Sequence, residues 1–204
     1  MTYTEDGNEE FSPSDIIALV NGEVIPRQEF EIRINQTQTA YQDQGANIDD
    51  DEVRRSIEDH VLEAMIGELL LEQEAEQADM PVSEDDIEEG YNQVRAEFDN
   101  DDVALIDALF AQGMTREDLR KEIADRLRIQ QYIENSIDPE DIQLSEDDIY
   151  AVYKNYTAEM KDAPPFEEVQ DELVSQLEET RLQQAVIVLI DKLRKVSEIE
   201  VFLE

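Results

Sequence analysis

The stretch ALVNGEVIPRQEF, which runs from Ala18 to Phe30, sets the architecture expected near the start of the chain. The dipeptide Asn21-Gly22 separates two short apolar runs, and Asn-Gly in this position is the strongest short-range indication of a two-residue β-hairpin. Pro26 follows, and proline is favoured in the first turn of a helix, where the amide hydrogen that it lacks would have no partner. The stretch therefore predicts a β-hairpin followed directly by a helix that ends at Gly45.

The pentapeptide SEDDI occurs twice downstream, at Ser83–Ile87 and at Ser145–Ile149. In each copy a serine stands three residues before an aspartate, which is the acidic form of a helix capping box. Apolar residues bracket each copy at the spacing of a hydrophobic staple, and the acidic side chains fall where the helix dipole favours negative charge. A metal site is the alternative that three acidic side chains raise, but the spacing favours two helix starts.

The rest of the chain reads as helices that end in one strand. Apolar residues recur at helical spacing over about 50–78, 83–98, 116–137, 145–160 and 166–195, and a shorter helix is expected between Asp102 and Gly113. The last residues, EIEVFL, alternate as in a strand, and an isolated hairpin is marginally stable, so we expect this strand to join it. The predicted fold class is mainly α, a multi-helix module with a small β-hairpin plus a C-terminal strand.

The net charge of −38, from 54 acidic and 16 basic residues, limits what the protein does. Ordinary small domains carry a net excess of about 2–8 charges, and a larger excess destabilises the compact state by self-repulsion. In molar salt the Debye length falls to about 3 Å and screens this repulsion, so the composition indicates a salt-adapted, halophilic protein. The periodic apolar residues argue against a disordered acidic chain. Nucleic-acid binding is excluded because no basic patch exists to neutralise phosphates.

Several kinds of catalytic and cofactor site lack the residues that they need. The chain has no cysteine and a single histidine, His60. Metal sites with cysteine ligands or with two histidines are therefore excluded, and a Ser-His-Asp triad would have to use His60. The acidic runs at 49–51 and 99–102 lack the glycine and the closing glutamate of a calcium-binding EF-hand loop. We therefore expect no catalytic residues, no metal and no cofactor.

The ends of the chain bear on its location. Residues 1–14, MTYTEDGNEEFSPS, are polar and acidic and are expected to form a flexible leader. No stretch of eighteen apolar residues is present, so membrane insertion is not expected. As written, the chain shows no signal peptide and would be cytoplasmic; the alternative is an extracytoplasmic protein whose export leader has been removed.

Four stretches, taken in order, resemble the chaperone module of the SurA/PrsA family, which is related in fold to trigger factor. The first is the hairpin and helix start quoted above, and the second joins a long apolar helix to the first SEDDI copy. The third opens with Gly113-Met114-Thr115, and the fourth closes the chain. The last three read VLEAMIGELLLEQEAEQADMPVSEDDI, GMTREDLRKEIADRLRIQQYI and FEEVQDELVSQLEETRLQQAVIVLIDKLRKVSEIEVFL.

The resemblance implies one chaperone domain over 15–204, with a helical arm at about 83–138 and a closing helix and strand at 164–203. Members of the family usually carry a parvulin prolyl-isomerase domain between the second capped helix and the closing helix. Here only five residues separate Met160 from Phe166, so no parvulin domain fits and the protein is not expected to be an enzyme.

The resemblance implies an ATP-independent holdase-type chaperone whose partners are unfolded or nascent polypeptides. No phosphate-binding GxxxxGK[ST] loop is present, which agrees with ATP independence. The alternatives are a helical adaptor for one dedicated folded partner and a divergent peptidyl-prolyl isomerase. Aromatic and methionine side chains suit promiscuous surfaces, and the expected client-binding residues are Tyr91, Phe98, Leu109, Phe110, Met114, Tyr132, Tyr150, Tyr153, Tyr156 and Met160.

Overall fold

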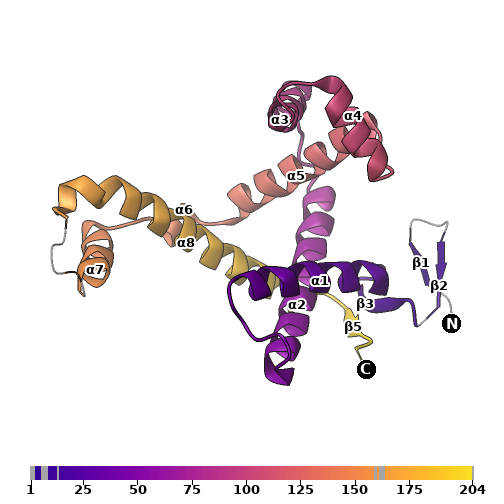
Figure 1. Cartoon of the computed structure of the whole chain (residues 1–204), viewed down its shortest axis with the longest axis horizontal. Coiled ribbons are helices and arrows are strands. Elements are labelled where there is room, and N and C mark those ends of the chain that lie inside the picture. The colour runs from indigo at the N-terminus through magenta and orange to yellow at the C-terminus, as the bar shows by residue number, and fades with distance from the viewer. Residues whose placement is uncertain (1–2, 6–8, 13, 159, 161–163, 204) are drawn as a thin grey trace. The chain divides into compact units, whose positions relative to one another are not determined.

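The structure is a computed structural model that describes residues 3–5, 9–12, 14–158, 160 and 164–203. Within this part of the chain it is mainly α, with eight helices and two small antiparallel sheets (Figure 1). The chain divides into two compact units, unit 1 with residues 1–132 and 193–204, and unit 2 with residues 133–192. The predicted fold class, mainly α with a hairpin and a C-terminal strand, is confirmed.

The main sheet of unit 1 joins the two ends of the chain. Strands β3 (Ile16–Val20), β4 (Glu23–Pro26) and β5 (Ile199–Val201) lie in the order β4-β3-β5, and all neighbours are antiparallel (Figure 1). Ala18 pairs with Ile25 on one side and with Val201 on the other. All five side chains of β3 are buried, so the central strand forms part of the core.

The hairpin turn has the predicted chemistry and an additional role. Asn21 and Gly22 have φ angles of 54° and 89°, the left-handed conformation that the two central residues of a type I′ turn require. The Asn21 side chain donates to Gln73 Oε1 at 2.8 Å and accepts from the Glu198 amide at 2.9 Å. This one residue therefore bonds the hairpin to helix α2 (Asp51–Gln77) and to the segment that leads into β5.

Helices α1 (Arg27–Asp43) and α2 (Asp51–Gln77) pack against each other and against β3. Pro26 is the last residue of β4 and stands before the helix rather than in its first turn, which corrects the sequence prediction. Asp50 caps α2 by accepting from the Glu52 amide at 2.8 Å. Most of the apolar middle of α2 is buried, and its exposed residues are Glu63, Ala64 and Glu68.

Three further helices of unit 1 surround a separate apolar cluster. These are α3 (Glu84–Glu97), α4 (Asp102–Ala111) and α5 (Arg116–Ser136), whose last four residues belong to unit 2. Arg120 of α5 donates to Glu88 of α3 at 2.7 Å and also bonds Glu84. The buried side chains of the cluster are Tyr91, Leu105, Leu109, Leu119 and Ile123.

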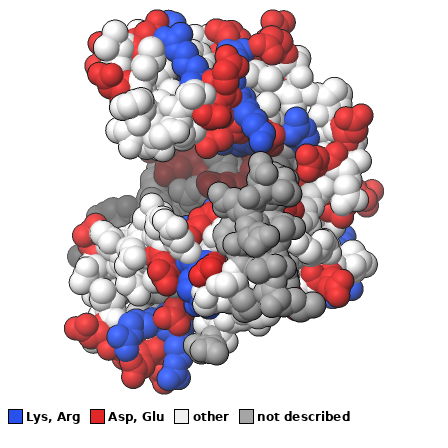
Figure 2. All heavy atoms as spheres, turned by 90° about the vertical axis from the view of Figure 1, so that its right-hand side faces the viewer, with Lys and Arg blue, Asp and Glu red and all other residues white. Residues whose placement is uncertain are grey.

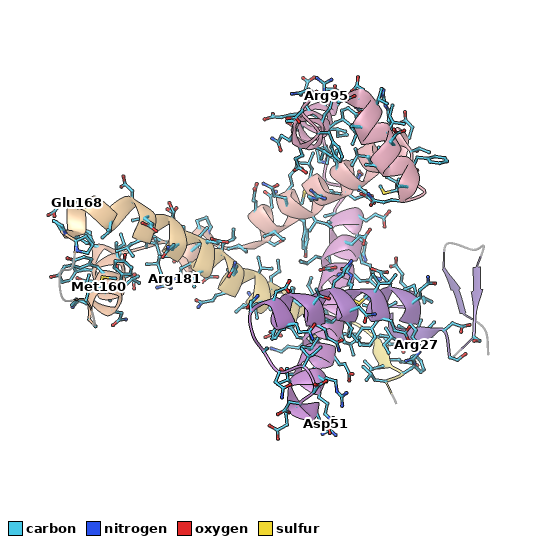
Figure 3. All side chains as sticks on the ribbon, in the orientation of Figure 1. Arg27, Asp51, Arg95, Met160, Glu168 and Arg181 are labelled. Carbon is cyan, nitrogen blue, oxygen red and sulfur yellow. The ribbon has the colours of Figure 1, made fainter. Side chains whose placement is uncertain are left out.

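Unit 2 contains α6 (Pro139–Ile142), α7 (Glu146–Thr157) and most of α8 (Phe166–Arg194). The short helix α6 was not expected from the sequence, although Asp138 at its N-cap and Pro139 in its first turn are typical of a helix start. Arg181 of α8, labelled in Figure 3, donates to Asp148 of α7 at 3.2 Å. This ion pair links the two longer helices of the unit.

Both SEDDI copies begin helices, as predicted. Ser83 accepts from the Asp86 amide at 3.1 Å, and Ser145 accepts from the Asp148 amide at the same distance. Of the two described copies, only the second forms a complete capping box, because the Asp148 carboxylate also accepts from the Ser145 amide at 3.0 Å. The two identical pentapeptides therefore stabilise their helix starts to different degrees.

The leader expected over 1–14 includes two short strands, β1 (Tyr3–Glu5) and β2 (Glu9–Phe11), which pair antiparallel. Residues 1–2, 6–8 and 13 lie outside the described part of the chain, and the flexibility of the leader stays a prediction. The single domain expected over 15–204, with its helical arm, also stays a prediction.

Candidate functional site

Four of the ten expected client-binding residues belong to the packing of α3, α4 and α5. Tyr91 and Leu109 are buried in the apolar cluster, with 7% and 6% of their surface exposed. Phe98 and Met114 are half-buried and pack against the same cluster. These four side chains hold three helices together, and we assign them a structural role.

Helix α4 carries a second apolar face that points to solvent. Val103, Ile106 and Phe110 follow one another at i, i+3 and i+7, the spacing of residues on one side of a helix. Their exposed fractions are 66%, 41% and 82%, while Leu105 and Leu109 occupy the buried side. We call these three exposed residues the α4 outer face.

The sequence prediction named Phe110 but not the other two members of this face. The indication was present, because α4 is apolar on two sides and only one side of a helix in a three-helix cluster is buried. Which side is buried depends on contacts with α3 and α5, and the period alone does not reveal it. Acidic side chains flank the face at Asp102 and Asp107, both exposed.

Acidic side chains surround the apolar parts of the surface. On the side of the molecule that Figure 2 shows, acidic side chains are spread widely and uncharged patches lie between them. Arg95, labelled in Figure 3, lies 3.8 Å from the Asp102 carboxylate at the start of α4. The α4 outer face is thus an apolar surface in an acidic environment.

A cluster of aromatic rings lies in unit 2, where α7 meets the start of α8. The Tyr153 and Phe166 ring centroids are 5.2 Å apart, and both rings contact Tyr150, at 5.9 Å and 5.8 Å. The Tyr153 hydroxyl donates to the Pro164 carbonyl at 2.8 Å. Tyr153 therefore fixes the connection between the two helices, and Tyr150 stays half exposed.

A groove of about 440 Å³ runs along this aromatic cluster, and we call it the α7–α8 groove. Sites that take small ligands or side chains measure about 300–1,000 Å³. Its apolar lining comes from Ile149, Tyr150 and Phe166. The remaining lining residues are polar or acidic, and they are Glu146, Asp147, Glu167 and Gln170.

The last three expected residues lie on different elements. Tyr132 is half-buried near the end of α5. Tyr156, in the last turn of α7, and Met160, just after it, are both exposed. Met160 and Glu168, labelled in Figure 3, mark where α7 ends and α8 begins. Of the ten residues, Tyr150, Tyr153, Tyr156 and Met160 are thus brought into one region of unit 2.

Comparison with known protein families is decisive for residues 2–133, which match the family described as the SurA-like N-terminal domain. The chain belongs to this family. The match includes the main helices of unit 1 and the α4 outer face, while the α7–α8 groove lies beyond it. The SurA-like family that the sequence resemblance suggested is therefore confirmed.

Comparisons with curated proteins and with solved structures do not extend this assignment. No curated protein matches the chain. One matching solved structure is described as "the virulence factor PEB4 and the periplasmic protein Cj1289", two SurA-like chaperones of Campylobacter jejuni. That match has 14% identity and a TM-score of 0.47, and it covers 91% of this chain and 98% of the other.

This SurA-like chain also has an acidic cluster in unit 1. A cavity of about 130 Å³ in unit 1 is lined by residues of β4, α2 and α5, among them Glu23, Glu72, Asp125 and Lys121. Burial raises the pKa of Glu72, and the nearby carboxylates of Glu23, Asp125 and Glu76 raise it further. Repulsion between these carboxylates therefore destabilises unit 1 when they are charged.

Two features are absent from the part of the chain that the structure describes. No three His, Cys, Asp or Glu side chains come together there in a way that could hold a metal ion. Among the helices of the same residues, none combines the length and apolar character needed to cross a bilayer.

Proposed function

We propose that the protein is an ATP-independent holdase that binds unfolded or partly folded polypeptides and keeps them soluble. The observation that carries this proposal is the α4 outer face, where Phe110 is 82% exposed and two further apolar side chains continue the surface. Exposed contiguous apolar residues on a soluble protein mark interaction sites. Membership of the SurA-like family supports polypeptides as the partners.

The charge of the chain explains how such a surface is compatible with solubility. With a net charge of −38, two copies repel each other at low ionic strength, so an apolar patch on one copy is kept from the patch on another. An unfolded client of lower net charge is repelled less, so its apolar segments still reach the patch. In concentrated salt this repulsion is screened, and we propose that hydration of the many carboxylates then keeps the holdase soluble.

The proposed client contacts lie on both units. They comprise the α4 outer face in unit 1 and the exposed side chains of Tyr150, Tyr156 and Met160 in unit 2. We propose no isomerase activity, because the sequence carries no parvulin-like segment between α7 and α8. For the compartment we propose an extracytoplasmic setting, which the family supports, and cell fractionation tests it.

The direct test is suppression of aggregation of a chemically denatured model client, without ATP, in about 2–3 M salt, where screening favours the folded state. Circular dichroism on the same sample checks that the chain is helical. We expect suppression at near-stoichiometric ratios. A well-folded helical sample that leaves aggregation unchanged contradicts the proposal.

The same sample separates the alternatives. An adaptor would capture one folded partner in a fixed ratio and would not suppress aggregation of unrelated clients. A divergent isomerase would accelerate cis–trans exchange of a proline-containing tetrapeptide, and we expect no acceleration above the uncatalysed rate.

A further inference from the structure

In the α7–α8 groove carboxylates belong to the lining itself, whereas at the α4 outer face they flank three apolar side chains. Ile149, Tyr150 and Phe166 supply an apolar and aromatic lining, and three carboxylates, from Glu146, Asp147 and Glu167, stand around it. All three acidic residues are exposed. No lysine or arginine is among the residues that line the groove.

The negative charge of the groove's acidic rim exceeds the positive charge of the nearby helix N-termini. The groove lies at the starts of α7 and α8, and each helix N-terminus carries about +0.5 of an elementary charge. Three carboxylates stand against about one positive charge from the helix termini and one from Lys154 beside Tyr150, which leaves about one negative charge. Asp148, the next acidic residue on α7, is bonded to Arg181 and to Ser145, so Arg181 neutralises Asp148 rather than the rim.

The aromatic lining also favours a cation. The Lys154 ammonium lies 4.9 Å from the Tyr150 ring centroid, which shows that this ring accepts a positive charge over its face. A guanidinium suits the groove better than an ammonium, because it is planar, stacks on aromatic rings and donates several hydrogen bonds to carboxylates.

We propose that the α7–α8 groove selects client segments in which an arginine lies next to an apolar or aromatic side chain. The apolar side chain packs on Ile149 and Phe166, and the guanidinium bonds the acidic rim. This inference rests on the proposed holdase function and names the client sequence that one of its two surfaces prefers. It also predicts that the two surfaces prefer different client sequences, since the α4 outer face is built of aliphatic and phenyl groups.

The test compares two short labelled peptides by fluorescence anisotropy, one with Arg-Leu-Arg-Phe at its centre and one with each arginine replaced by glutamine. The buffer has about 0.1 M ionic strength, where the Debye length is about 10 Å. Sucrose replaces concentrated salt, because an excluded osmolyte stabilises the folded chain without screening its charges. Circular dichroism confirms that every sample is helical.

The groove variant is E146Q/D147N/E167Q, which removes the charge and keeps the shape. The matched control is E178Q/E179Q/D191N, three exposed acidic residues of α8, whose nearest member lies about 12 Å along the helix from Gln170. We expect wild-type protein and the control to bind the arginine peptide about tenfold more tightly than the glutamine peptide, and the groove variant to lose most of this difference.

Equal affinity of the folded wild-type protein for both peptides overturns the inference. The inference also fails if the groove variant and the control lose the preference for the arginine peptide to the same extent. If aggregation is still suppressed in either case, the holdase function stands and only the client preference fails. A folded protein that binds neither peptide and suppresses no aggregation overturns both. If the groove variant does not fold, a salt titration of wild-type protein decides. In that case about 1 M salt must weaken binding of the arginine peptide more than binding of the glutamine peptide.

Discussion

Two tyrosines illustrate how one hydroxyl group acts in opposite ways at the residue scale. The Tyr91 hydroxyl is buried in the cluster of α3, α4 and α5 and has no hydrogen-bond partner among the described residues. The Tyr153 hydroxyl donates to the Pro164 carbonyl at 2.8 Å. An unpartnered buried polar group costs free energy, whereas a hydrogen bond of this kind contributes about 0.5–1.5 kcal/mol.

We therefore expect opposite effects from the same substitution. Y91F should leave the free energy of unfolding unchanged or raise it by up to about 1 kcal/mol, and Y153F should lower it by about 1 kcal/mol. Urea titrations followed by circular dichroism measure both variants, and each serves as the control for the other. A clear loss of stability in Y91F would show that its hydroxyl has a partner, such as a buried water.

The acidic cluster around Glu72 predicts a dependence on pH. Burial and the carboxylates of Glu23, Asp125 and Glu76 raise the pKa of Glu72, and Lys121 opposes them; Arg128 also lines the cavity. A carboxyl group whose pKa is raised by folding favours the fold when it is protonated and opposes it when it is charged. The charged form is present at neutral pH, so Glu72 lowers the stability there.

The substitution E72Q should therefore raise Tm at pH 7 by about 1–3 °C. The gain should shrink as the pH falls and vanish below the ordinary value of 4.5, where the carboxyl group is protonated in both states. Thermal scans across this range measure the effect, with E58Q on the same helix as the control. A gain that persists at low pH would mean that packing, not charge, explains it.

At the scale of elements, Gly90 determines how closely α3 and α5 approach. A Cβ atom at position 90 would lie 2.7 Å from Cγ2 of Ile123, a distance that real Cβ atoms do not adopt. Ile123 is buried, and its Cγ2 is attached directly to the stiff β-branched carbon, so it has little room to move.

We expect G90A to destabilise the protein by about 1–3 kcal/mol, although alanine favours a helix more than glycine does. The second variant, I123L, removes Cγ2 and should restore part of the loss when combined with G90A. A double-mutant cycle of unfolding free energies measures this coupling. Additive effects of the two substitutions would contradict the close approach.

The sequence was a good guide to elements and a poor guide to surfaces. The Asn21-Gly22 turn, both SEDDI caps and the third strand were predicted because each depends on local chemistry or on alternation along the chain. Helix α6 was missed because a four-residue helix carries almost no periodic pattern. The start of α1 was one residue off, because Pro26 is suited both to the end of an edge strand and to a helix start.

The candidate surfaces could be predicted only in part, for a physical reason. Aromatic residues serve cores and binding faces equally well, so Tyr91 and Leu109 were expected at the surface and lie in the core. The three residues of the α4 outer face required knowledge of which side of α4 meets α5. The α7–α8 groove joins positions 146–150 with 166–170 through tertiary contacts of Tyr153 and Phe166, which no local pattern encodes.

At the scale of the whole molecule, charge governs stability. With a net charge of −38, we expect Tm to rise steadily as salt increases from about 0.1 M to 2–3 M, because screening removes self-repulsion. Differential scanning calorimetry in NaCl, with sucrose as an uncharged control, measures the rise. A Tm that is independent of salt would contradict the salt-adapted interpretation.

The same scans test the single domain proposed for 15–204. Two helices, α5 and α8, run across the boundary between the two compact units. We expect one cooperative transition, because unwinding such a helix in one unit removes part of the other. Two separate transitions would show that the units fold independently.

The central claim is that the α4 outer face binds unfolded chains. The most direct measurement is the affinity of a permanently unfolded, soluble client for wild-type protein and three variants. V103Q changes a valine of the face, and V196Q changes a valine that is 83% exposed elsewhere in unit 1. F110Q removes the most exposed side chain of the face. We predict that V103Q and F110Q weaken binding by about threefold and tenfold, while V196Q matches wild type. Equal affinity of all four folded proteins would contradict the account.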